Sequence, residues 1–130
     1  MTTQCLTPNQ IIAYNLRRAR FERGLTQEEA TALLSPYLGV KWSKAVYSAA
    51  ERSAERPGRI RRFSADDLMA FAAAFDLPVA FFMAPKADFD VRLRGAHIGY
   101  DQAFRLVQPK GVDTESLRKL DEIRRIVSVS

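Results

Sequence analysis

The feature that most constrains the fold is a helix stop followed at once by a helix start, within residues 20–30. Gly24 follows a basic stretch with helical spacing, and glycine readily adopts the left-handed conformation that ends helices. Thr26 and Glu29 then have the spacing of a capping box, in which each side chain accepts a hydrogen bond from the other residue's backbone N–H. Two helices are therefore expected to meet at a tight corner near the start of the chain.

Apolar spacing and capping residues predict three helices in the first 52 residues. The first begins near Pro8, because proline is tolerated in the first turn of a helix, and ends at Gly24. The second runs over residues 26–34 and is expected to stop at Ser35-Pro36, since proline interrupts helical hydrogen bonding. The third runs over residues 43–52 and has a serine at its capping position.

Two further helices are predicted before Pro85. Residues 53–62 have no apolar period and contain Pro57-Gly58, so we expect a basic loop. Ser64 then begins a second capping sequence and a helix with Leu68, Phe71, Ala72 and Phe75 on one face, and Pro78 begins a short fifth helix. Five short helices predict a compact α-helical bundle.

The pattern changes after Pro85. Apolar and polar residues alternate over residues 89–93, which predicts a strand, and residues 104–106 fit either a second strand or a short helix. Residues 113–127 are expected to form a last helix with a narrow apolar seam, suited to packing against a partner helix. The seam consists of Leu117, Leu120, Ile123 and Val127. The expected fold is thus mainly α, with a helical domain over residues 1–85 and a C-terminal extension over residues 86–130.

The distribution of charge indicates an anionic partner. The chain has a net charge of +5, and its arginines are clustered. Residues 52–62 contain five arginines and one glutamate, and the first helix is also rich in arginine. Clustered basic residues of this kind are typical of nucleic-acid-binding proteins.

Other features argue against several classes of protein. Cys5 is the only cysteine, so an intrachain disulfide is excluded and the chain is expected to be cytoplasmic. No apolar run approaches the roughly 18 residues that span a bilayer, and no signal peptide is expected. His97 has no partner at metal-ligand spacing, and enzyme motifs are missing. We therefore expect no metal, no cofactor and no enzymatic activity.

From Ile12 to Pro85 the chain resembles the lambda-repressor-like, or XRE, family of bacterial and phage helix-turn-helix regulators. The resemblance rests on residues 20–30 at the first corner and on residues 46–52, which end in the Glu-Arg pair of the family's recognition helix. Residues 63–68 and 75–79 resemble the family's closing helices. The resemblance implies a five-helix DNA-binding domain whose third helix lies in the major groove.

The chain departs from the family pattern in two places. The family usually has glycine after the Glu-Arg pair, whereas this chain has Ser53-Ala54 followed by a basic insertion. The turn before the third helix is also lengthened, over residues 36–42. Both differences bear on the angle of the third helix and on its contacts.

The resemblance implies a set of DNA contacts. Gln27 would reach a phosphate, or else face solvent. Val46, Tyr47 and Ala50 would face inward on the third helix, and Lys44 would either contact DNA or remain a solvated surface lysine. The arginines of the loop would clamp the backbone, insert into a narrow minor groove, or form a solvated charge run. The residues predicted to contact DNA are Gln27, Ser43, Lys44, Ala45, Ser48, Ala49, Arg52, Arg59, Arg61 and Arg62.

Three side chains on this domain are expected to have structural roles. Trp42 and Tyr37, which flank the lengthened turn, are expected to pack in the core. Glu51 is expected to pair with Arg20 or Arg23.

Two functions fit the sequence. The first is a dimeric, sequence-specific DNA-binding repressor associated with the nucleoid, with double-stranded DNA as its partner and the seam of residues 117–127 as the dimer contact. The second is an antitoxin-like protein that binds a toxin or another protein through residues 86–130 and autoregulates through the same DNA-binding domain. The predicted strand and helix of residues 86–130 do not decide between these two functions, because such an extension suits either one.

Overall fold

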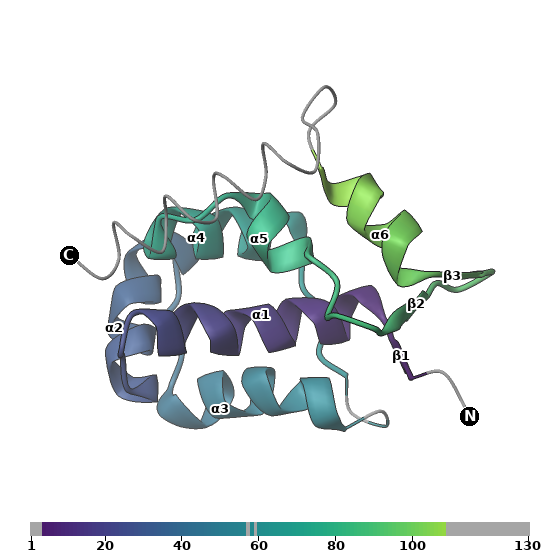
Figure 1. The fold of residues 1–130 in the computed structure, drawn as a ribbon. Coiled ribbons are helices and arrows are strands. Elements are labelled where there is room, and N and C mark those ends of the chain that lie inside the picture. The colour runs from purple at the N-terminus through teal and green to yellow at the C-terminus, as the bar shows by residue number, and fades with distance from the viewer. Residues whose placement is uncertain (1–3, 57, 59, 109–130) are drawn as a thin grey trace.

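The structure is a computed structural model that describes residues 4–56, 58 and 60–108 (Figure 1). Most of these residues are helical, which confirms the predicted mainly α class. The elements in chain order are β1 (Cys5–Leu6), α1 (Pro8–Glu22), α2 (Gln27–Leu38), α3 (Lys44–Arg52), the short 3₁₀ helix η1 (Ser53–Glu55), α4 (Ala65–Phe75), α5 (Val79–Met83), β2 (Asp90–Arg92), β3 (His97–Ile98) and α6 (Tyr100–Val107).

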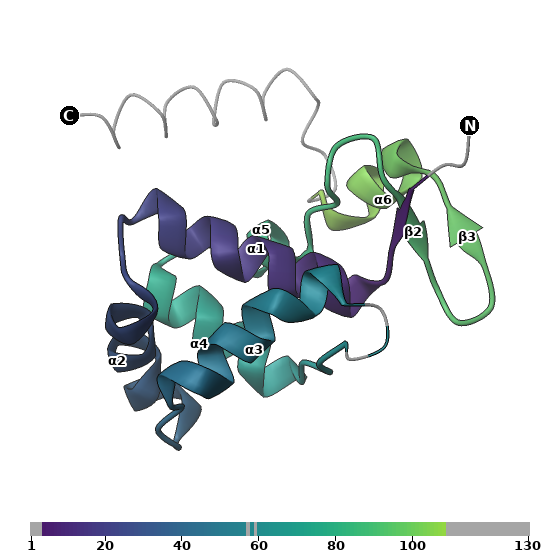
Figure 2. The same cartoon turned by 90° about the horizontal axis from the view of Figure 1, so that it is seen from below.

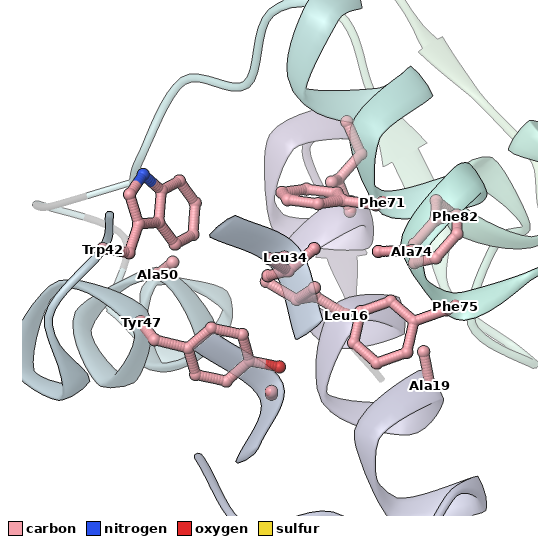
Figure 3. Packing of buried hydrophobic residues seen from close by; sticks show 12 residues of the cluster. Leu16, Ala19, Leu34, Trp42, Tyr47, Ala50, Phe71, Ala74, Phe75 and Phe82 are labelled. Atoms are coloured by element: carbon pink, nitrogen blue, oxygen red, sulfur yellow. The ribbon is translucent and has the colours of Figure 1, made fainter. Parts of the chain in front are cut away.

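Helix α1 lies at the centre of the helical domain, with α3 on one side and α4 and α5 on the other (Figures 1 and 2). The main core fills the space between these helices. Figure 3 shows Leu16 of α1 and Leu34 of α2 between two groups of rings. One group is Trp42 and Tyr47, and the other comes from α4 and α5. The Phe71 ring contacts the rings of Trp42 and Phe82, at centroid distances of 6.1 and 5.8 Å. Aromatic pairs at these separations contribute to stability beyond their buried area.

Helix boundaries follow the capping residues. Thr26 and Ser64 each form the predicted capping box, with Glu29 and Asp67 as their respective partners. Ser43 accepts a hydrogen bond from the Val46 N–H and so caps α3, as predicted. Gly24 has a φ of +64°, which confirms the predicted left-handed stop after α1.

The predicted end of α2 is wrong. The helix passes through Pro36 and continues to Leu38. Pro36 lies in the last turn, so its missing N–H removes a single helical hydrogen bond, and only two helical residues follow it. Gly39, with a φ of +75°, is the residue that stops the helix. The connection to α3 is therefore residues 39–43, and residues 36–38 of the lengthened turn predicted over residues 36–42 belong to the last turn of α2.

The start of the extension contributes β2 and β3 to a small three-stranded sheet in the order β1–β2–β3, and β1 comes from the opposite end of the described chain. Strand β2 lies within the predicted strand over residues 89–93, and it pairs in parallel with β1 and antiparallel with β3. Neither partner strand was predicted. Residues 104–106 lie in α6, so of the two predicted alternatives the short helix is correct and the strand is wrong.

A second, smaller core joins this sheet to the helical domain. Ile11 of α1, Val91 of β2 and Ala103 of α6 are buried together, with Leu6 and Ile98 packed beside them. The predicted division at residue 85 thus falls between two regions that share buried contacts. The helix predicted over residues 113–127 lies outside the described residues.

Within the part of the chain that the structure describes, every helix is too short or too polar to cross a bilayer.

Candidate nucleic-acid interface

Helix α3 presents a face of small and basic side chains. Lys44, Ala45, Ala49 and Arg52 are exposed, as is the capping residue Ser43, and Ser48 is half-buried. On the opposite side, Tyr47, Ala50 and Glu51 are buried. The outward positions predicted for this helix therefore do lie away from the core.

Val46 is an exception to the predicted orientation. It was expected to face inward, but 37% of it is exposed. The buried stripe of α3 consists of Tyr47, Ala50 and Glu51, at spacings of three and one, and Val46 lies beside this stripe rather than in it. The exposed side of α3 thus includes one branched apolar side chain that the sequence analysis had placed in the core.

A buried ion pair fixes α3 to α1. Arg20 Nε donates to Glu51 Oε1 at 2.6 Å, and Arg20 Nη2 donates to Glu51 Oε2 at 3.1 Å. The remaining Arg20 Nη1 donates to the backbone oxygen of Leu25, which lies just before α2. Of the two predicted partners for Glu51, Arg20 is therefore the correct one.

This ion pair is shielded from water. The Arg20 and Glu51 side chains are only 12% and 3% exposed. The hydrogen bonds to Glu51 raise the pKa of Arg20, and burial raises the pKa of the neighbouring Tyr47, so the guanidinium stays charged and the phenol stays neutral. Any shift of α3 away from α1 would leave a buried charge without its partner, which is strongly unfavourable.

Gln27 joins the same cluster from the start of α2. Its Nε2 donates to Glu51 Oε2 at 3.2 Å, and its side chain is half-buried. The ion pair and this hydrogen bond together connect α1, α2 and α3. Gln27 is thus held in place by Glu51 rather than facing solvent freely, whereas its predicted contact with a phosphate stays a prediction.

Lys44 lies near an acidic side chain. Its Nζ is 3.7 Å from Glu28 Oε1, and both side chains are exposed. Exposed pairs of this kind contribute about 0–1 kcal/mol, so Lys44 can leave Glu28 for a more strongly charged partner at little cost.

The basic residues that follow α3 differ in their surroundings. Arg62 is exposed, whereas Arg61 is half-buried and its guanidinium lies over the Trp42 ring, 4.6 Å from the ring centroid. Arg59 lies outside the described residues. The predicted loop also begins later than expected, because residues 53–55 form η1, where Glu55 accepts a hydrogen bond from Arg17 at 2.8 Å.

The two aromatic residues near the turn behave differently. Trp42 is buried against Tyr47 and Phe71, as predicted. Tyr37 is 54% exposed, so its predicted packing in the core is wrong. Because α2 continues through Pro36, Tyr37 lies on the outer side of the last helical turn rather than in a loop folded against the core.

Two polar residues of the first turn of α1 were missed by the sequence analysis. Gln10 Nε2 donates to the backbone oxygen of Ala54 at 3.3 Å, and Asn9 Oδ1 accepts from the Phe63 N–H at 2.9 Å. These bonds hold the chain just before and just after the basic residues. The only sequence signal was a pair of polar residues at a helix start, which usually face solvent.

The lone histidine lies near the lone cysteine. His97 Nδ1 is 3.8 Å from Cys5 Sγ, and the two residues belong to the two outer strands of the small sheet. Among the residues that the structure describes, no group of three or more acidic, histidine or cysteine side chains is arranged to hold a metal ion.

Comparison of the chain with models of known protein families, with curated proteins and with solved structures found no match.

Proposed function

We propose that this chain is a sequence-specific DNA-binding transcriptional regulator of the lambda-repressor-like type, with α3 as its recognition helix. The observation that carries the proposal is the combination of an exposed face of small and basic residues on α3 with a buried ion pair that holds α3 against α1. A recognition helix needs both properties, because its outer face must enter the major groove while its inner face is held rigidly. The sequence resemblance supports the same assignment.

The face of α3 suggests how DNA would be read. Lys44 can donate to guanine O6 and N7, and Ser48 can pair with several base edges. The methyl groups of Ala45, Val46 and Ala49 are suited to the thymine methyl. This face offers few bidentate donors, so we expect modest direct readout and a large share of affinity from phosphate contacts by Gln27, Ser43, Arg52 and the arginines after η1.

We further propose that the protein acts as a homodimer and represses by occupying its operator. A single domain of this size contacts about one half-site, and specificity in such regulators usually needs two half-sites about one helical turn apart. The extension is the proposed dimer contact. Within its described part, Leu93 and Leu106 are exposed, and apolar side chains of this kind are suited to an interface.

The experiment that tests this function is selection of bound duplexes from a random DNA pool by the full-length protein at near-physiological salt. We expect enrichment of an inverted repeat. The Lys44→Ala/Ser48→Ala variant should relax the selected sequence while leaving the fold intact. Arg94→Ala is the control, because Arg94 is exposed in the β2–β3 turn, far along the chain from α3. If the wild-type protein enriches no sequence, or if the double variant selects the same sequence, the proposed reading by α3 is wrong.

A second candidate is the antitoxin-like function, and the exposed Leu93 and Leu106 also favour it, since they suit a protein partner. The two candidates differ in the oligomeric state. If the extension forms the homodimer, Leu106→Glu in the full-length protein should lower its mass in solution from dimer to monomer. A dimer that persists would show that Leu106 lies outside the dimer contact and is available to a separate protein partner.

A further inference from the structure

The basic segment Ile60–Arg62 is held at its far end by the core. The Phe63 N–H donates to Asn9, and the Phe63 ring packs against Phe71 at a centroid distance of 5.7 Å. Trp42 contacts the same Phe71 ring at 6.1 Å. Phe63 and Trp42 thus contact the same buried ring, although they are far apart in the sequence. This arrangement brings the residues just before Phe63 close to Trp42.

Arg61, which lies in this segment, contacts the Trp42 ring. Its guanidinium carbon is 4.6 Å from the centroid of the Trp42 ring, a distance typical of a cation–π contact. Arg61 Nε is buried and has no hydrogen-bond partner among the described residues. No salt bridge to Arg61 is found among them either, so the ring of Trp42 is the observed contact that accounts for the position of this guanidinium.

Trp42 is buried and directly precedes the cap of α3. It is buried against Tyr47 and Phe71, and the residue that follows it, Ser43, is the cap of α3. A guanidinium stacked on Trp42 is therefore held near the start of α3. Figure 2 shows α3 and α4 lying close to one another, and the basic segment directly precedes α4.

We infer that Arg61 is a positioning residue rather than one of several equivalent phosphate contacts. Stacked on Trp42, it fixes the backbone of the basic segment beside the start of α3, and the exposed Arg62 is thereby placed to contact a phosphate next to the base-reading face. The contact between Arg62 and DNA rests on the proposed function. The stacking of Arg61 on Trp42 does not, so the two parts are tested separately.

The first test needs no DNA. Trp42 is the only tryptophan, so the intrinsic emission of the full-length protein reports on its surroundings. Arg61→Met keeps much of the side-chain length but removes the planar cation, and we expect it to change the intensity or wavelength of the emission. Arg62→Met is the matched control, because it removes the same charge from the adjacent exposed residue, and it should leave the emission unchanged. Identical emission from the two variants would overturn the stacking.

The second test measures the affinity of full-length protein for a selected duplex at several salt concentrations. Loss of one phosphate contact lowers the slope of log affinity against log salt by about one. We expect Arg62→Met to lower the slope by about one. Arg61→Met should lower it by the same amount, because without the contact to Trp42 the segment no longer holds Arg62 beside the DNA. The double variant should be no worse than Arg61→Met alone, since the two residues act through one contact.

The outcomes are distinguishable. If the double variant lowers the slope by about two, the two arginines contact DNA independently and the positioning role is wrong. If the wild-type protein shows no specific DNA binding while Arg61→Met still changes the emission, the proposed function fails and the stacking stands. Both substitutions lie outside the main core, so the variants are expected to fold, which circular dichroism verifies.

Discussion

Replacing Glu51 by glutamine should destabilise the protein severely. The carboxylate accepts two hydrogen bonds from Arg20, at 2.6 and 3.1 Å, and one from Gln27. The substitution keeps the shape of the side chain but leaves the Arg20 guanidinium, which is 12% exposed, without a counter-charge. Removing one partner of a buried ion pair costs about 3–5 kcal/mol. That is a large part of the roughly 5–15 kcal/mol by which domains are stable.

The chain contains a matched control for this substitution. Glu55 pairs with Arg17 at 2.8 Å, but these side chains are 66% and 43% exposed. Water can solvate either partner when the other is lost, and exposed pairs contribute about 0–1 kcal/mol. Glu55→Gln should therefore lower the free energy of unfolding by less than about 1 kcal/mol. The two variants share the same chemistry and differ in burial.

Urea unfolding measures both effects. Trp42 lies in the core, so its emission follows the transition, and linear extrapolation gives the free energy of unfolding in water. An Arg20→Met/Glu51→Leu double variant should be more stable than Glu51→Gln, because it removes both charges instead of leaving one unpaired. If Glu51→Gln and Glu55→Gln cost the same small amount, the ion pair is effectively solvated and our account of how α3 is held is refuted.

Two further predictions concern helix ends. Gly39→Ala should destabilise the protein by roughly 1–2 kcal/mol in thermal melts, because Gly39 has a φ of +75°, which is unfavourable for alanine. Gly95→Ala is the control and should have little effect, because Gly95 has open space around it and no positive φ. Hydrogen bonds from Thr26 lower the pKa of Glu29 below its ordinary value. The stabilisation by this cap is therefore complete above the ordinary pKa of a glutamate and is lost as the pH falls through the lower, folded-state pKa. Glu29→Ala should therefore lower the melting temperature at pH 7 and make a smaller difference at pH 2; an equal difference at both would show that the charge of Glu29 is not involved.

The elements predicted correctly from the sequence are those that depend on neighbouring residues. The stop at Gly24 and the caps at Thr26, Ser43 and Ser64 were predicted because a cap is a hydrogen bond between residues three apart. The apolar face of α4 was predicted in part from helical periodicity. Phe71 and Phe75 are buried as expected, whereas Leu68 and Ala72 are half-buried, and the buried Ala70 and Ala74 were not predicted. Pro36 shows the limit of such rules. The helix was predicted to stop at Ser35-Pro36, and this was wrong, because α2 continues through Pro36 to Leu38 and ends at Gly39.

The tertiary structure alone decided the contacts between distant segments. Strands β1 and β2 pair although they lie near opposite ends of the described chain, and no local pattern in Cys5–Leu6 indicates this partner. The choice of Arg20 over Arg23 for Glu51 likewise depends on how α1 packs against α3.

The candidate site divides in the same way. The sequence by itself determined that α3 begins after Ser43 and that basic residues follow it. The structure decided that Val46 is partly exposed, that Asn9 and Gln10 hold the chain on either side of those basic residues, and that Arg61 rests on Trp42 while Arg62 does not. The physical reason is that capping and periodicity act within about one helical turn, whereas these contacts form only when remote segments pack around a shared core.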